Sequence, residues 1–180
     1  MRAVLVRHTR LAADMAGHCY GRTEVALADS FAEEARALRA ALPWEPREVW
    51  TSPARRCRML AEALAAGAPV RVDARLQELD FGAWEGRRWE TFRGPESEAW
   101  ALDPWTRRPP EGETGLELWT RVAAVRAEIN ALLEDARVLV VTHAGVIRAW
   151  KHLAAGGGPG PAVFGTDVGY GHVWPACGKE

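Results

Sequence analysis

The stretch RVLVVTHAGVIRAWKHLAA, residues 137–155, decides the fold. Its first half is a run of β-branched and aliphatic residues, which is typical of a strand buried on both faces of a sheet. His143 ends that run, and the residues after it predict a helix that stops at the glycine-rich stretch beginning at residue 156. A buried strand that turns directly into a helix is typical of a parallel α/β sheet.

The same alternation of strand and helix recurs along the 180 residues. Further strands are expected over residues 2–6, 47–52, 69–72 and 169–174, and further helices over residues 31–42, 54–66, 95–102 and 114–134. Ser30 and Ser52 are each expected to cap the helix that follows, with Glu33 completing a capping box for the first. We therefore predict an α/β fold, a three-layer α/β/α sandwich around a mostly parallel central sheet, forming one domain over residues 1–180.

The composition argues against several classes of partner. A net charge of −1 gives no general attraction to nucleic acid or to an anionic membrane. Cys19, Cys57 and Cys177 are too few for a disulfide framework, and no signal peptide or long apolar run is visible, so we expect a cytoplasmic protein. No H-x-H or H-E-x-x-H pattern predicts a metal site, and no cofactor is expected. The sequence leaves open whether the protein forms a homodimer.

Charged and catalytic residue types follow the predicted strands at the point where each strand ends. They are Arg7 and His8 after the first strand, Arg55 and Arg56 after the second, Glu78 after the third, and His143 after the fourth. Because ligands of open α/β sheets bind outside the carboxyl ends of the strands, we expect these side chains to share one rim.

This set of residue types suits phosphoryl transfer. Arginine is always charged and donates bidentately to phosphate oxygens, and fixed positive charge is the main catalytic need of that reaction. Neighbouring guanidinium groups keep a histidine neutral and therefore nucleophilic, and a carboxylic acid can protonate the leaving oxygen. The simpler alternative is a polar loop at Arg7–His8 and arginines that face solvent. Four such features at four strand ends favour the phosphate site.

Four motifs in this order resemble the histidine phosphatase superfamily, also called the phosphoglycerate mutase-like family. They read LVRHT, TSPARRCRMLAEAL, LQELDFGAWEG and VVTHAGVIR in this chain. The resemblance spans residues 2 to about 150 and implies a phosphoglycerate mutase-like fold, a phosphohistidine intermediate and no metal. Thr9 stands where the family carries glycine after the histidine.

The resemblance also implies roles for individual residues. His8 corresponds to the nucleophile, and His143 to the second histidine, which donates to the phosphoryl oxygens. Glu78 corresponds to the proton donor, with Asp80 and Glu85 as alternatives, although Glu85 is expected to be structural. The phosphate ligands it implies are Arg7, Arg56 and His143, to which the hydroxyl of Thr9 can add a further donor.

Two further segments are similar to one group within that family. CYGRTEVALA at residues 19–28 and PPEGETGLELWTRV at 109–122 resemble the α-ribazole-5'-phosphate phosphatases of cobalamin nucleotide-loop synthesis. Glu78 and His143 are 65 residues apart, which favours a phosphatase over the mutases with their longer insertion. The expected partner is thus a small-molecule phosphate monoester with a flat base. The candidate substrate-binding residues are Tyr20, Gly21, Arg22, Thr23 and Trp84.

Three other functions are kept as alternatives. A broad-specificity phosphatase would use the same site on other esters. A phosphoglycerate mutase-type phosphotransferase would return the phosphoryl group to an acceptor. A non-catalytic binding module would keep the fold without the chemistry, and the joint presence of all five candidate residues disfavours it.

Overall fold

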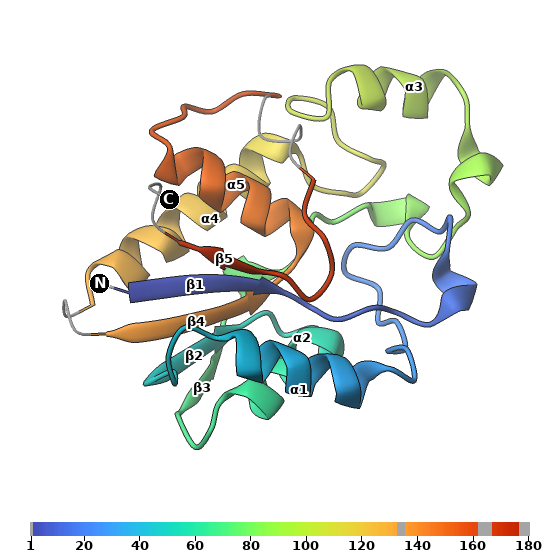
Figure 1. Ribbon diagram of the computed structural model, residues 1–180. Helices are drawn as coiled ribbons and strands as arrows, with labels where there is room; N and C mark the ends of the chain where they lie inside the picture. The colour runs from blue at the N-terminus through green and yellow to red at the C-terminus, as the bar shows by residue number, and fades with distance from the viewer. Residues whose placement is uncertain (1, 133–135, 162–166, 177–180) are drawn as a thin grey trace.

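A computed structural model describes residues 2–132, 136–161 and 167–176 of the chain. Five strands form one sheet in the order β3-β2-β4-β1-β5. The strands are β1 (Arg2–Arg7), β2 (Glu48–Thr51), β3 (Val70–Val72), β4 (Arg137–Thr142) and β5 (Val173–Pro175). The first four are parallel, and β5 runs antiparallel to β1 at the edge of the sheet (Figure 1).

Helices cover both faces of this sheet (Figure 1). Helices α1 (Phe31–Ala41) and α2 (Arg55–Leu64) lie on one face, and α4 (Gly115–Asn130) and α5 (Ala144–Ala154) lie on the other. Helix α3 (Pro95–Leu102) lies apart from the sheet. Alternate residues of each strand point to opposite faces. Leu139 and Val141 therefore pack with α1 and α2, whereas Val138 and Val140 pack with α4 and α5. The expected three-layer α/β/α sandwich with a mostly parallel sheet is confirmed.

The pairing of β1 with β4 sets the position of the polar residues beyond them. Arg7 pairs with Thr142 in parallel register. The next residue continues this pairing, because the backbone N–H of His8 donates to the carbonyl of Thr142 at 3.1 Å. His8 and His143 therefore leave the sheet side by side. Ser52 joins them from β2, since its backbone N–H donates to the Val141 carbonyl at 3.1 Å.

The capping contacts at the starts of two helices differ from the expected ones. Helix α2 begins at Arg55 with Ala54 at its cap, so the prediction that Ser52 caps it is wrong. Ser30 does precede α1, but its hydroxyl donates to Glu34 at 2.5 Å and makes no side-chain cap, and the expected capping box with Glu33 is not formed. The Ser52 hydroxyl instead accepts from the Ala54 N–H at 3.3 Å and lies 2.8 Å from Nε2 of His143.

Helix α4 begins with a reciprocal capping box. Thr114 Oγ1 accepts from the Glu117 N–H at 3.2 Å, and the Glu117 carboxylate accepts from the Thr114 N–H at 2.8 Å. The helix ends at Asn130, short of the expected end at residues 133–134, which lie outside the described residues. None of the helices in the described parts of the chain is both long and apolar enough to cross a lipid bilayer.

The last strand is shorter than expected. Only Val173–Pro175 pairs with β1, whereas residues 169–172 of the predicted strand do not. The segment before β5 instead passes over the carboxyl end of β1, where the Gly171 N–H donates to the His8 carbonyl at 3.3 Å. This path places Tyr170 close to the polar rim of the sheet.

Candidate active site

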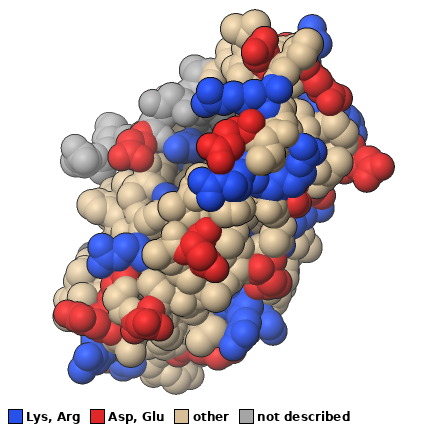
Figure 2. Space-filling view, turned by 90° about the vertical axis from the view of Figure 1, so that its right-hand side faces the viewer, with Lys and Arg blue, Asp and Glu red and all other residues tan. Residues whose placement is uncertain are grey.

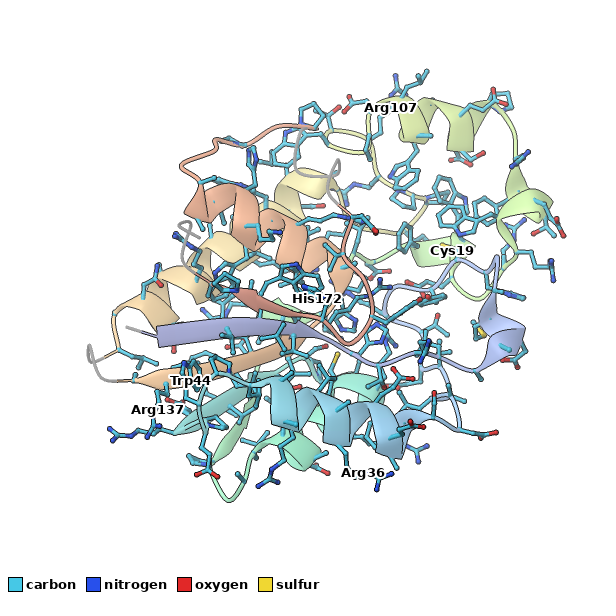
Figure 3. The ribbon with its side chains drawn as sticks, viewed as in Figure 1. Cys19, Arg36, Trp44, Arg107, Arg137 and His172 are labelled. Atoms are coloured by element: carbon cyan, nitrogen blue, oxygen red, sulfur yellow. The ribbon has the colours of Figure 1, made fainter. Side chains whose placement is uncertain are left out.

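The side chains predicted to share one rim lie at the carboxyl ends of β1, β2 and β4. Figure 3 shows side chains gathered there between the labelled His172 and Cys19, whereas Arg137 and Trp44 mark the opposite, amino ends of the strands. The structure brings together His8, His143, Arg7 and Arg56, and it places Glu78 next to them.

His8 is oriented as a nucleophile. Its ring is 2% exposed, and Nδ1 lies 2.9 Å from the carbonyl oxygen of Thr9. A carbonyl only accepts hydrogen bonds, so Nδ1 carries the proton and Nε2 keeps its lone pair. Burial lowers the pKa of His8 to about 3, and the charges of Arg56 and Arg7 add to this effect. The imidazole is therefore neutral at pH 7, as nucleophilic attack requires.

His143 is a second buried imidazole beside the first. The two ring centroids are 5.3 Å apart, and His143 is 1% exposed. Its Nε2 lies 2.8 Å from the Ser52 hydroxyl, and its Nδ1 lies 3.4 Å from Nη2 of Arg56. Because a guanidinium only donates, Nδ1 is the acceptor and Nε2 carries the proton toward Ser52. Burial and the Arg56 charge hold the pKa of His143 well below its usual range.

Two arginines supply the positive charge of the site. Arg56 is 1% exposed and donates to the carbonyls of Thr23 at 2.8 Å and Gly21 at 2.5 Å. Arg7 donates to the Val168 carbonyl at 2.6 Å. The Nε–H groups of both arginines are buried, and within the described residues neither has a hydrogen-bond partner. Buried donors are normally satisfied, so these two point to an anion with several acceptor oxygens.

The surface around the site has no comparable excess of positive charge. Figure 2 looks onto the side of the molecule reached by the carboxyl ends of the strands, and it shows basic and acidic side chains intermixed. Arg22, for example, pairs with Asp80 at 3.0 Å and with Glu113 at 3.4 Å. Attraction of an anion therefore depends on the buried arginines rather than on the field of the whole protein.

Glu78 is held against the first turn of α5. Both of its carboxylate oxygens lie 3.1 Å from the backbone N–H of Gly145, and Oε1 also accepts from Leu79 N–H at 3.0 Å. A Cβ on residue 145 would lie 2.2 Å from Oε1 of Glu78, so any larger residue there would force the carboxylate to move. The helix that follows His143 thus fixes the candidate proton donor directly.

Glu85, an alternative acid, is engaged in hydrogen bonds to the surrounding loop. It accepts from the backbone N–H groups of Gly21, Arg22, Thr23 and Phe81 and from the Thr23 hydroxyl. Burial raises the pKa of Glu85, but these hydrogen bonds lower it more, so the pKa of the carboxyl stays below its usual range. The carboxylate organises the loop around it, as expected for a structural role.

Asp80, the other alternative, is also engaged away from the histidines. Its carboxylate pairs with Arg22 and accepts from the Gly82 N–H at 2.8 Å. Glu78, by contrast, lines a cavity of about 290 Å³ together with Arg7. The geometry therefore favours Glu78 as the proton donor.

Residues 21–23 were predicted to bind substrate, but in the structure they hydrogen-bond to Glu85 and Arg56 and so support the candidate phosphate site. Their N–H groups surround the Glu85 carboxylate, and the carbonyls of Gly21 and Thr23 hold Arg56. A Cβ on residue 21 would lie 1.9 Å from the carbonyl oxygen of Leu79, so only glycine fits this loop. Arg22 directs its side chain to two carboxylates rather than into the cavity.

The prediction that Trp84 offers a flat face to substrate is wrong. Trp84 is 3% exposed, and its ring stacks on Phe92 with centroids 5.1 Å apart. The aromatic residues that do line the cavity beside Glu78 are Tyr20, Phe81, Trp89 and Trp100, with His18 and Arg148 also at its wall. Tyr20 was predicted. The tryptophan-rich segment 84–105 was the signal for Trp89 and Trp100, but it has no periodicity that distinguishes buried from exposed rings.

Tyr170 is a further site residue that sequence reasoning missed. Its ring lies 3.7 Å from the guanidinium carbon of Arg7, and its centroid is 5.5 Å from that of His8. Its hydroxyl lies 2.5 Å from that of Tyr20. Tyr170, from the segment before β5, therefore packs against both Arg7 and His8. A single aromatic residue between glycines was the only sequence signal.

Thr9 occupies the position of the family glycine without disturbing His8. It is fully buried, and its backbone carbonyl is the group that contacts His8. Its hydroxyl has no hydrogen-bond partner among the described residues, and its role as a phosphate donor stays a prediction. Within the same residues, no group of three or more His, Cys, Asp or Glu side chains could hold a metal ion.

Gly145→Ala should damage the site although alanine is the better helix former. In an open helix the change stabilises by about 1 kcal/mol. Here the new methyl group collides with Glu78, so we expect kcat for an alkyl phosphate to fall by about 10²-fold, the lower end of the contribution of a positioned acid. Gly94→Ala, where a Cβ meets nothing within 4 Å, is the matched control. Equal activity of the two variants would contradict the placement of Glu78.

Acidification should destabilise the fold through His8. The unfolded chain binds a proton near the ordinary pKa of 6.5, whereas folded His8 stays neutral down to about pH 3. The unfolded state therefore binds more protons, and the free energy of unfolding falls as the pH drops from 6.5 towards 3. This one group contributes up to roughly 1.4 kcal/mol per pH unit.

Urea unfolding of wild type and His8→Asn between pH 6.5 and pH 4 checks this expectation. Carboxylates titrate equally in both proteins, so the difference in slope reports on His8. The variant should lose stability more slowly on acidification, and His152→Asn, remote from the site, should behave as wild type. Parallel curves for wild type and His8→Asn would show that His8 is not held neutral.

Comparison with known proteins places this geometry in a family. The model of the histidine phosphatase superfamily (branch 1) matches residues 3–163. The adenosylcobalamin/α-ribazole phosphatase of Salmonella typhimurium is 29% identical over 154 residues, which cover 82% of this chain and 76% of that protein.

Two solved structures share the fold. The α-ribazole phosphatase from Shigella flexneri superimposes with a TM-score of 0.87 at 24% identity, covering 96% of this chain and 88% of that one. The protein TTHB049 from Thermus thermophilus gives a TM-score of 0.72 at 31% identity, covering 96% and 91%. With the family model matching most of its length, the chain belongs to the histidine phosphatase superfamily.

Proposed function

We propose that this protein hydrolyses phosphate monoesters through a phosphohistidine at His8. The observation that carries the proposal is the buried, neutral His8, whose Nε2 is unprotonated beside two arginines with unpartnered Nε–H groups. A phosphoryl group supplies the oxygens that those donors lack, and its phosphorus is the electrophile that a neutral imidazole attacks.

The reaction proceeds in two displacements. In the first, the Nε2 lone pair of His8 forms a bond to phosphorus, the bond from phosphorus to the ester oxygen breaks, and Glu78 gives its proton to that oxygen. In the second, Glu78 takes a proton from water, the water oxygen bonds to phosphorus, and the N–P bond breaks to release phosphate. Arg7 and Arg56 hold the phosphoryl oxygens in both steps, and His143 joins them when its Nε2–H turns from Ser52 to a phosphoryl oxygen.

We further propose that the substrate is α-ribazole 5'-phosphate, used in cobalamin nucleotide-loop synthesis. Two similar proteins carry the name α-ribazole phosphatase. In addition, the cavity beside Glu78 receives the leaving group, and its wall is rich in aromatic rings from Tyr20, Phe81, Trp89 and Trp100. A flat benzimidazole base can stack on such rings, whereas a small polar alcohol gains little from them.

Phosphate release in the presence of a chelator tests both levels of the proposal. The substrates are α-ribazole 5'-phosphate, ribose 5-phosphate and 3-phosphoglycerate. We expect kcat/KM to be at least about tenfold higher for the ribazole ester, which corresponds to roughly one stacking interaction. Equal rates would contradict the specific substrate only, and no turnover of any ester would contradict the phosphatase.

Trp89→Ala separates base recognition from catalysis. It should raise KM for the ribazole ester about tenfold and leave KM for ribose 5-phosphate nearly unchanged, because only the first substrate has a base to stack. Trp44→Ala, at the amino ends of the strands and away from the cavity, controls for the loss of a tryptophan (Figure 3). An equal effect of Trp89→Ala on both substrates would contradict stacking on this wall.

A further inference from the structure

We propose that Arg121, acting with Glu113, is a positioning residue for the proton donor Glu78. Arg121 lies on α4. Its Nη1 donates to the carbonyls of Arg75 at 2.7 Å and Gln77 at 2.6 Å, and its Nη2 donates to the Glu78 carbonyl at 3.0 Å. One guanidinium thus holds three carbonyls of the segment that carries the acid.

Glu113 holds that guanidinium in place. Its Oε1 accepts from Nε of Arg121 at 2.7 Å, and its Oε2 accepts from Nη2 at 2.8 Å. The side chains of Arg121 and Glu113 are only 15% and 10% exposed. With these two bonds and the three carbonyls, all five N–H donors of the guanidinium are used. Such a fully bonded and largely buried pair has one defined geometry.

The segment before Glu78 needs this support because it lacks a sheet partner. It follows the 3-10 turn Ala74–Leu76, which packs against α4. Among the described residues, the carbonyls of Arg75, Gln77 and Glu78 take their side-chain hydrogen bonds from Arg121. The backbone of Glu78 is therefore fixed by α4, while its carboxylate is fixed by Gly145 of α5.

This arrangement bears on catalysis because proton transfer is sensitive to the placement of the acid. A general acid must lie within hydrogen-bond reach of the leaving oxygen, and a shift of about 1 Å can cost 10²-fold. Lysine keeps the charge toward Glu113 but cannot donate to three carbonyls in a plane. Arg121→Lys should therefore displace Glu78 without removing it.

The experiment compares two phosphate esters that differ in their need for an acid. The leaving group of p-nitrophenyl phosphate departs without protonation, whereas the alcohol of ribose 5-phosphate requires it. For Arg121→Lys we compare kcat/KM, which reports phosphoryl transfer to His8 and not the later hydrolysis step that both esters share. We expect kcat/KM to fall about 10²-fold with ribose 5-phosphate and to change little with p-nitrophenyl phosphate. Glu78→Gln, measured in parallel, defines the full leaving-group dependence.

Two further variants keep the test decisive. Glu113→Gln loses the charge that orients Arg121 and should show the same selective loss in a smaller amount, so it serves if Arg121→Lys does not fold. Arg108→Lys alters only exposed contacts, those of Arg108 with Glu117 and with the Gly112 carbonyl, and should match wild type on both esters. Thermal midpoints recorded for each variant show whether it is folded at the assay temperature.

The outcomes distinguish this inference from the proposed function on which it rests. Loss of kcat/KM on both esters to the same extent, or on neither, for the folded Arg121 and Glu113 variants would overturn the positioning role. A wild-type protein with no turnover of either ester would instead overturn the phosphatase itself. The choice of natural substrate does not enter, because neither ester contains a ribazole base.

Discussion

The parallel pairing of β1 with β4 is the constraint on which the site depends. Its register places Arg7 opposite Thr142, so the next residues, His8 and His143, leave the sheet together. A shift by one residue would turn the apolar side chains of β1 to the wrong faces of the sheet. The same burial that fixes the core therefore fixes the distance between the two imidazoles.

Burial and positive charge together set the chemistry of those imidazoles. Burial removes His8 and His143 from water, and the charge of Arg56 acts on both rings. Each effect favours the neutral form of histidine. A nitrogen lone pair is therefore available beside two guanidinium groups that can bind the negative oxygens of a phosphoryl group. The positive charge is in turn kept buried by neutral carbonyl acceptors, as at Gly21 and Thr23, rather than by carboxylates that would compete with a phosphate.

The sequence predicted the parts of the site that follow from regular structure. Arg7, His8 and His143 end strongly apolar strands, and parallel strands bring their carboxyl ends to one edge. The orientation of Trp84 could not be predicted, because the segment around it has no period and its burial depends on contacts with distant rings. Arg121 was equally hidden, since on sequence it is an ordinary polar position of an amphipathic helix.

The most direct test of the account is identification of the phosphorylated residue during turnover. The protein is mixed with ribose 5-phosphate, quenched within one turnover in alkali, where phosphohistidine survives, and digested for mass spectrometry. The account predicts phosphate on the peptide that carries His8, and its absence in His8→Asn. Phosphate on His143, or turnover without any phosphoenzyme in the wild type, would contradict the account.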